Sequence, residues 1–231
     1  MLKKITLAAV IIFSAVSLVA APKVKIDQSS KKALAESFIR VICAKDIDGL
    51  EKLFAPGFAD TLKDMLKFQG NNVGLSSLFD NVTIPAGECE KINRDPAEFR
   101  KATEQLMKHG FDKGSIKING KWYLFVNTII KSDSKNMVTL CYILAIKNSD
   151  ACTLFAICSP EVQEKMIKIH GSKSQAIEKI AQLLKAMPED TKKQFSQVDF
   201  KDLKMLAKVV EEGEKQGILT QIDGKWYINF N

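Results

Sequence analysis

The sequence predicts an α+β fold that is mostly α, built as two tandem repeats, each a helical bundle closed by a C-terminal β-hairpin. The first observation is a phrase that occurs twice, 104 residues apart: Ile-Asn-Gly-Lys-Trp-Tyr at 118–123 and Ile-Asp-Gly-Lys-Trp-Tyr at 222–227. The second is an apolar stripe with helical spacing before each phrase, at 99, 102 and 106 and again at 203, 206 and 210. We therefore expect repeat domains at 28–130 and 134–231.

Helices and one hairpin are predicted for the first repeat. Ser29 or Ser30 is a suitable cap for its first helix, and Asp95 followed by Pro96 is a strong start for its last. Asn119-Gly120 lies between two β runs and predicts a type I′ turn, which needs positive φ at both residues. We expect helices over 30–44, 47–54, 58–68 and 95–108, a short strand or extended link at 82–84, and strands over 115–118 and 121–126.

The second repeat follows the same plan. We expect helices over 137–156, from Pro160, over 172–186, from Pro188, and over 199–216, followed by the closing hairpin around Asp223-Gly224. Upstream, the offset between the repeats falls to 101, which matches the Leu-Phe-Ala of 53–55 with that of 154–156. This alignment predicts a three-residue insertion at 157–159, in a loop between helices.

The N-terminus resembles a targeting segment. Lys3 and Lys4 precede an apolar run over 5–19, and small residues follow at 19–21. This pattern predicts a signal peptide at 1–21, and the run is short for a membrane span. We expect an exported protein, periplasmic or secreted, with no stable transmembrane segment after cleavage.

The chain contains five cysteines, an odd number for an exported protein. Cys152 and Cys158 are the closest pair in sequence and are the first candidate disulfide; the alternative is that most of the five are buried thiols. The sequence contains no Cys-x-x-Cys motif and no zinc-ligand spacing with His, so we expect no metal and no cofactor.

The net charge of +7 is spread along both repeats and alternates with acidic residues. Such interleaving is typical of a solvated surface, so we expect no nucleic-acid partner. A protein, a peptide or an envelope component remains open as the partner.

Both ends of each repeat resemble the NTF2-like superfamily. In the first repeat the resemblance lies in residues 33–46, Leu50 and the Leu-Phe-Ala-Pro of 53–56. In the second it lies in residues 143–148, 154–156 and Pro160. The Gly-Lys-Trp-Tyr phrases resemble the last strand turn of secreted members. The middle of each repeat departs from that superfamily's long curved strands, so the resemblance carries over no catalytic residue.

The aromatic residues of the two phrases are the candidate binding residues. Neighbouring positions on a strand face opposite ways, so within Trp122 and Tyr123, and within Trp226 and Tyr227, one ring points outward. An outward ring indicates either docking between the repeats or a partner surface, while a buried Trp that only packs is the structural alternative.

Catalytic signals are sparse. His109 and His170 are the only histidines and occupy unrelated positions in the repeats, and no catalytic motif occurs. We therefore predict a non-catalytic binding or interaction protein of the bacterial envelope. The alternative is a hydrolase or isomerase with a pocket in one repeat only.

Overall fold

The computed structural model describes residues 23–68, 70, 75–76, 84–111, 114–125, 133–197 and 203–230. The prediction of an α+β fold that is mostly α is confirmed, because helices dominate these residues and the strands form two small antiparallel hairpins. The signal peptide predicted at 1–21, most of the link at 82–84 and the predicted helix start at 199 lie outside the described residues. Within the described ranges, no helix is long and apolar enough to cross a membrane.

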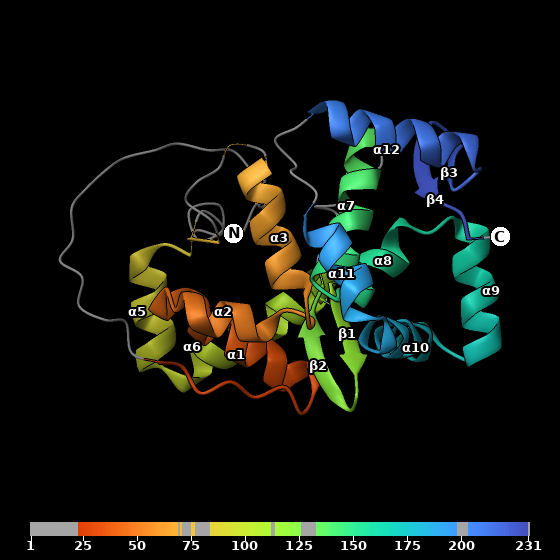
Figure 1. Ribbon diagram of the computed structural model, residues 1–231. Coiled ribbons are helices and arrows are strands. Elements are labelled where there is room, and N and C mark those ends of the chain that lie inside the picture. The colour runs from red at the N-terminus through yellow and green to blue at the C-terminus, as the bar shows by residue number, and fades with distance from the viewer. Residues whose placement is uncertain are drawn as a thin grey trace. The chain divides into compact units, whose positions relative to one another are not determined.

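The chain forms two compact units, and the first is a small helical assembly. Its described elements are α1 (Lys31–Ala44), α2 (Ile47–Leu53), α5 (Ala86–Arg94), α6 (Pro96–Leu106) and the π-helical turn η1 (Met107–Phe111). Figure 1 shows α1 among the other helices of this unit, and it contacts all of them. Ser30 caps α1 by accepting a hydrogen bond from the Ala33 N–H at 3.0 Å. A disulfide between Cys43 on α1 and Cys89 on α5 links two of these helices.

The second unit contains both hairpins. Its described elements are α3 (Phe58–Phe68), β1 (Ser115–Ile118), β2 (Lys121–Leu124), α7 (Lys135–Lys147), α8 (Ala151–Ile157), α9 (Pro160–His170), α10 (Lys173–Ala186), α11 (Glu189–Ser196), α12 (Leu203–Lys215), β3 (Leu219–Ile222) and β4 (Lys225–Ile228). Helix α7 is the central element, since it contacts α3, α8, α11, α12 and β4 (Figure 1). It buries residues on every side, as a helix enclosed by neighbours must.

Both hairpins turn as the sequence predicts. Asn119 and Gly120 have φ of 48° and 80°, and Asp223 and Gly224 have φ of 49° and 76°. These left-handed values define the two-residue turns that Asn-Gly and Asp-Gly favour. The strands pair antiparallel in the same register, with Ile118 opposite Lys121 and Ile222 opposite Lys225.

Several backbone interactions recur at an offset of 104 residues. The Ala55 N–H donates to the Leu124 carbonyl at 2.9 Å, and the Ser159 N–H donates to the Ile228 carbonyl at 3.0 Å. At the end of α1 and of α7 the chain reverses through a residue with positive φ, Lys45 in one case and Ser149 in the other. The contacts of α1 with α2, α5 and α6 likewise recur as contacts of α7 with α8, α11 and α12.

The structure shows the same offset of 104 residues throughout, which corrects the offset of 101 that the sequence alignment gave for the upstream part of the repeats. The three-residue insertion expected at 157–159 is wrong: Ile157 ends α8, Cys158 follows it, and Ser159 caps α9. The backbone of Cys158 forms an isolated β-bridge with Ile228, just as Phe54 does with Leu124. The Leu-Phe-Ala match therefore pairs residues that occupy different places in the fold.

The structure adds two helix details to the prediction. The stretch expected to be helical over 137–156 is largely helical, and it consists of two helices, because the chain reverses at Ser149 and Asp150 caps α8 by accepting a hydrogen bond from the Thr153 N–H at 3.0 Å. Helix α5 was not expected at all. Its sequence is rich in charge and poor in apolar residues, and the disulfide at Cys89 together with its packing on α1 and α6 holds it in place.

Candidate functional site

The predicted aromatic residues are all half-buried. Trp122 and Tyr123 lie on β2, and Trp226 and Tyr227 lie on β4. Lys135 lies over the Trp226 ring with its Nζ 5.7 Å from the ring centre, and the same Nζ is 2.9 Å from a Glu214 carboxylate oxygen. An ion pair between α7 and α12 therefore lies against Trp226.

The two hairpins do not pair with each other, since each forms its own two-stranded sheet. The first hairpin instead packs on α10 through β1. At its turn, the Asn119 N–H donates a hydrogen bond to a Glu178 carboxylate oxygen at 2.6 Å. This contact crosses between the predicted repeats inside the second unit, and it involves neither of the aromatic residues of β2.

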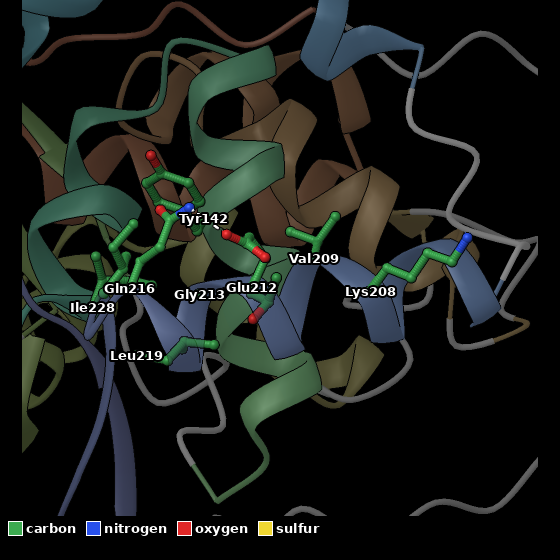
Figure 2. Close-up of a pocket in the computed structure, with 10 residues that line it drawn as sticks. Tyr142, Lys208, Val209, Glu212, Gly213, Gln216, Leu219 and Ile228 are labelled. Atoms are coloured by element: carbon green, nitrogen blue, oxygen red, sulfur yellow. Dashed lines mark hydrogen bonds between the residues drawn. The ribbon is translucent and has the colours of Figure 1, made fainter.

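A groove lies between α7 and α12 in the second unit, with β3 and β4 at its base. Its volume is about 410 Å³, at the small end of ligand pockets. Figure 2 shows side chains from α12 and from both strands gathered around it, with Tyr142 contributed by α7. The lining residues, which define the α7–α12 groove, are Thr139, Tyr142, Lys208, Val209, Glu212, Gly213, Gln216, Ile218, Leu219 and Ile228.

Tyr142 is the aromatic residue of the groove. Its ring contacts Phe195 edge-on and Phe230 in a tilted arrangement, each with ring centres 6.2 Å apart. Burial raises the pKa of Tyr142, and Cys158 nearby adds to the rise, so this phenol stays neutral and can both donate and accept a hydrogen bond.

Glycine and a hydrogen-bonded pair shape the α12 side of the groove. Gly213 brings α12 close to β3, because a Cβ at this position would lie 3.2 Å from a methyl carbon of Leu219. The Gln216 side-chain amide donates to a Glu212 carboxylate oxygen at 2.6 Å (Figure 2). The acidic residues Glu211, Glu212 and Glu214 thus make three separate side-chain contacts, with Lys215, with Gln216 and with Lys135 of α7.

Thr139 supplies a second hydroxyl on α7. Its side chain is 3% exposed, and its Oγ1 atom is buried without a hydrogen-bond partner. A buried polar atom left unpaired costs about 1–3 kcal/mol. Packing alone does not require a threonine here, since valine would fill the same space.

Polar atoms without partners gather around the corner between α7 and α8. Asp150 is completely buried, and its Oδ2 atom, like Thr153 Oγ1, has no hydrogen-bond partner. Burial raises the pKa of Asp150 to about 6, partly offset by the hydrogen bond that its Oδ1 atom accepts from the Thr153 N–H. Asp46, 104 residues earlier, accepts bonds on both oxygens, from the Gly49 N–H and the Val24 N–H, each at 2.9 Å.

The predicted Cys152–Cys158 disulfide is wrong. Both are buried free thiols, as is Cys141, and the disulfide in the described residues joins Cys43 and Cys89. Cys152 lies inside α8 and Cys158 follows its end, where the thiol donates to the Leu154 carbonyl at 3.2 Å. Burial raises the pKa of Cys158 to about 12 and that of Cys152 as well, so these thiols are poor nucleophiles.

Each histidine lies at or just beyond the end of an α-helix. His109 is in η1 at the end of α6, and His170 is the last residue of α9. Neither lines the groove. Among the described residues, no group of three or more His, Cys, Asp or Glu side chains is arranged to hold a metal ion.

Sequence reasoning missed the groove because it concentrated on the repeated phrase. None of the four predicted aromatic residues lines it, so their role in binding stays a prediction. Comparison with protein-family models, with curated proteins and with solved structures gives no match for this chain. The resemblance to the NTF2-like superfamily therefore also stays a prediction.

Proposed function

We propose that this chain is an exported, non-catalytic binding protein of the bacterial envelope and that the α7–α12 groove is its binding site. The groove carries this proposal. It is mostly apolar and open, and its polar groups are hydroxyls, an amide, one lysine and one carboxylate. Such a surface can hold an apolar ligand and orient it by a few hydrogen bonds.

We also propose that the chain arose by duplication of a unit of about 100 residues. The support is the offset of 104 residues, which holds for the hairpin turns, for the bonds between the hairpins and the preceding helices, and for the reversals after α1 and α7. Duplication relaxes constraints on one copy, and the α7–α12 groove lies entirely in the second copy.

The disulfide supports export. Disulfides form and persist in oxidising compartments and are rare in the cytosol. Cys43 and Cys89 are 46 residues apart in sequence and are joined through two packed helices. N-terminal sequencing of the protein from a periplasmic or culture fraction should find a chain that begins near residue 21 or 22. A cytoplasmic chain that retains Met1 would contradict export.

The alternative proposal, a hydrolase or isomerase with a pocket in one repeat, shares the same groove. It would need a general base there, and Glu212 is the carboxylate among the lining residues. Its bond to Gln216 holds it at the mouth of the groove. Under the binding proposal, Glu212→Gln should leave ligand affinity within about threefold, whereas a general base would be indispensable for turnover.

Binding in the groove can be tested with a hydrophobic dye. We expect 1-anilinonaphthalene-8-sulfonate to fluoresce on binding the folded protein and to lose most of that signal in Val209→Phe, which fills the groove from α12. Ile222→Phe is the matched control, because Ile222 is an exposed residue of β3 outside the groove lining. Equal dye binding by both variants and the parent protein would show that the groove is not the site.

A further inference from the structure

We propose that α9 and the second hairpin form a docking surface for a helix of another protein, one that carries a carboxylate beside an apolar stripe. Neither the residues of α9 nor Ile222 line the α7–α12 groove, so the inference goes beyond the function proposed for that groove. It starts from two contacts inside the second unit, in which α3 packs on α7 and β1 packs on α10. At the offset of 104 residues, α9 corresponds to α3 and β3 corresponds to β1.

Helix α3 packs on α7 through an apolar contact and an ion pair. Met65 of α3 is 2% exposed, and its sulfur lies 3.9 Å from the Cys141 sulfur of α7. At the end of α7, the Lys147 Nζ is 2.9 Å from an Asp64 carboxylate oxygen. A helix is thus held on α3 by an apolar stripe with one charge beside it. The other buried residues of this stripe are Phe58 and Leu62.

Helix α9 repeats the apolar stripe but leaves its end exposed. Ile169 stands at the position of Met65 and is 75% exposed, and Met166 before it is half-buried. Because α7 covers the corresponding side chain of α3, the exposed end of the α9 stripe fits a helix that packs as α7 does. The stripe residues of α9, in the order of their counterparts on α3, are Val162, Met166 and Ile169.

The second hairpin shows the same difference at an independent place. Where β1 packs on α10, Ile118 is 5% exposed, and the Asn119 N–H donates to the Glu178 carboxylate. The corresponding Ile222 of β3 is 38% exposed. This hairpin is joined to the start of α9 by the backbone bond from Ser159 to β4. Both parts of the surface that is covered in the predicted first repeat are therefore exposed in the second.

The charge beside the stripe is reversed on α9. Lys168 is exposed and occupies the position that Asp64 has on α3. The neighbouring Lys165 is already paired within α9, with a carboxylate oxygen 2.8 Å from its Nζ, which leaves Lys168 as the charge beside Ile169. A helix that docks here as α7 docks on α3 therefore needs a carboxylate where α7 has Lys147.

A second copy of this chain does not supply such a helix. The counterpart of α7 is α1, in which Ser37 and Cys43 stand at the positions of Cys141 and Lys147. Ser37 is completely buried, and its hydroxyl accepts from the Asp27 N–H at 2.9 Å and donates to the Asp27 carbonyl at 3.1 Å. Cys43 is in the disulfide and carries no charge. Because the segment before α1 and the disulfide close this face, the α9 surface fits a helix of another protein.

The test uses protein-observed NMR of the full disulfide-bonded chain and two synthetic peptides of residues 134–148, the segment that packs on α3. One peptide keeps Lys147 and the other carries Lys147→Glu. Both carry Cys141→Ala, which removes the thiol, and Tyr142→Gln, which replaces a residue of the α7–α12 groove and improves solubility. We expect the Lys147→Glu peptide to bind about two- to fivefold more tightly and to shift the amide signals of Ile169 and Ile222.

Lys168→Asp assigns this preference to α9. It should move the ratio of the two affinities about tenfold toward the Lys147 peptide, because each attraction becomes a repulsion and each repulsion an attraction. The two peptides also differ in helix stability, but that difference is the same on both proteins and cancels in the comparison.

Three further variants define the surface. Ile169→Asp should abolish binding of both peptides, whereas Leu183→Asp, at an exposed position of α10, is the matched control and should leave it unchanged. Val209→Phe in the α7–α12 groove should also leave it unchanged. Failure of the α9 surface and failure of the groove are therefore distinguished.

Each outcome supports or overturns the proposal. Shifts at Ile169 together with the expected change of ratio support it. An unchanged ratio in Lys168→Asp would overturn the chemistry of the partner, and shifts at Val209 in place of Ile169, or no shifts, would overturn the docking surface. Sedimentation equilibrium of the chain alone tests the other occupant: a dimer that Ile169→Asp dissociates would assign the surface to a second copy and overturn the proposal, whereas a monomer agrees with it.

Discussion

Asp150 makes the stability of this protein depend on pH in the direction opposite to that of most carboxylates. Its side chain is completely buried, one oxygen caps α8, and the other has no hydrogen-bond partner. Burial raises its pKa from 3.8 to about 6, so the folded protein holds a proton that the unfolded chain has already lost at pH 5. The perturbation we suggest is Asp150→Asn, which keeps an oxygen for the cap and removes the charge.

The sign and size follow from proton linkage. Where the folded state binds more protons than the unfolded state, the free energy of unfolding falls as pH rises. For this group the fall begins near pH 4 and is complete above about pH 6, where the buried carboxylate is ionised in both states. Each pKa unit corresponds to about 1.4 kcal/mol, so the rise from 3.8 to about 6 amounts to about 3 kcal/mol.

Urea unfolding followed by circular dichroism between pH 4 and pH 7 measures this effect. We expect Asp150→Asn to gain about 3 kcal/mol relative to the parent protein as pH rises from 4 to 7, because other titrating groups are shared by both proteins. Asp46→Asn is the matched control, since the two Asp46 oxygens accept bonds from backbone N–H groups at 2.9 Å. A difference between Asp150→Asn and the parent protein that stays constant across this pH range would refute the reasoning.

Two further predictions concern stability at constant pH. Replacing Cys43 and Cys89 together by serine should lower the free energy of unfolding by about 4 kcal/mol, as loop-closure entropy gives for a separation of 46 residues, and a smaller loss than about 1 kcal/mol under non-reducing conditions would contradict it. Gly57→Ala should cost about 1–3 kcal/mol more than Gly70→Ala: both glycines have positive φ, but a Cβ at Gly57 would lie 2.5 Å from the Asn148 carbonyl oxygen, whereas one at Gly70 meets nothing within 4 Å. Equal thermal and urea stability of the two alanine variants would show that the close approach is not limiting.

The elements that the sequence predicts well are those defined by local chemistry. The Asn119-Gly120 and Asp223-Gly224 turns, the Ser30 cap and the Asp95-Pro96 helix start depend on the conformations and hydrogen bonds of two or three neighbouring residues. Each of these features has the predicted geometry.

The features that the sequence did not predict depend on residues far apart. Helix α5 has few apolar residues of its own, and its disulfide partner lies 46 residues away. The break between α7 and α8 falls at the four polar residues 147–150, and the structure shows that they form a reversal at Ser149 followed by the cap at Asp150.

The groove was hidden by the wrong offset. With an offset of 101, Phe38 is matched with Thr139. This alignment conceals that α7 carries hydroxyl groups where the corresponding residues of α1 are apolar. With the offset of 104 that the backbone bonds share, Ala35 corresponds to Thr139 and Phe38 to Tyr142. The candidate site therefore required the structure, because only the structure aligned the two halves of the chain correctly.

The position of the unpaired polar atoms connects stability to the proposed site. In the part of the chain that the structure describes, Thr139 Oγ1 lies on α7, Asp150 Oδ2 at the turn after it and Thr153 Oγ1 on α8. Their counterparts in the first copy are Ala35, a fully bonded Asp46 and Gly49, none of which leaves such an atom unpaired. Buried polar groups without partners are uncommon in native proteins, and strain, a functional role or an ordered water or ion accounts for each. Of the four such atoms in the described residues, three lie in the predicted second repeat, which carries the groove, and Ser115 Oγ lies in the predicted first, so the cost of unpaired polar groups falls mainly on the part of the chain that forms the groove.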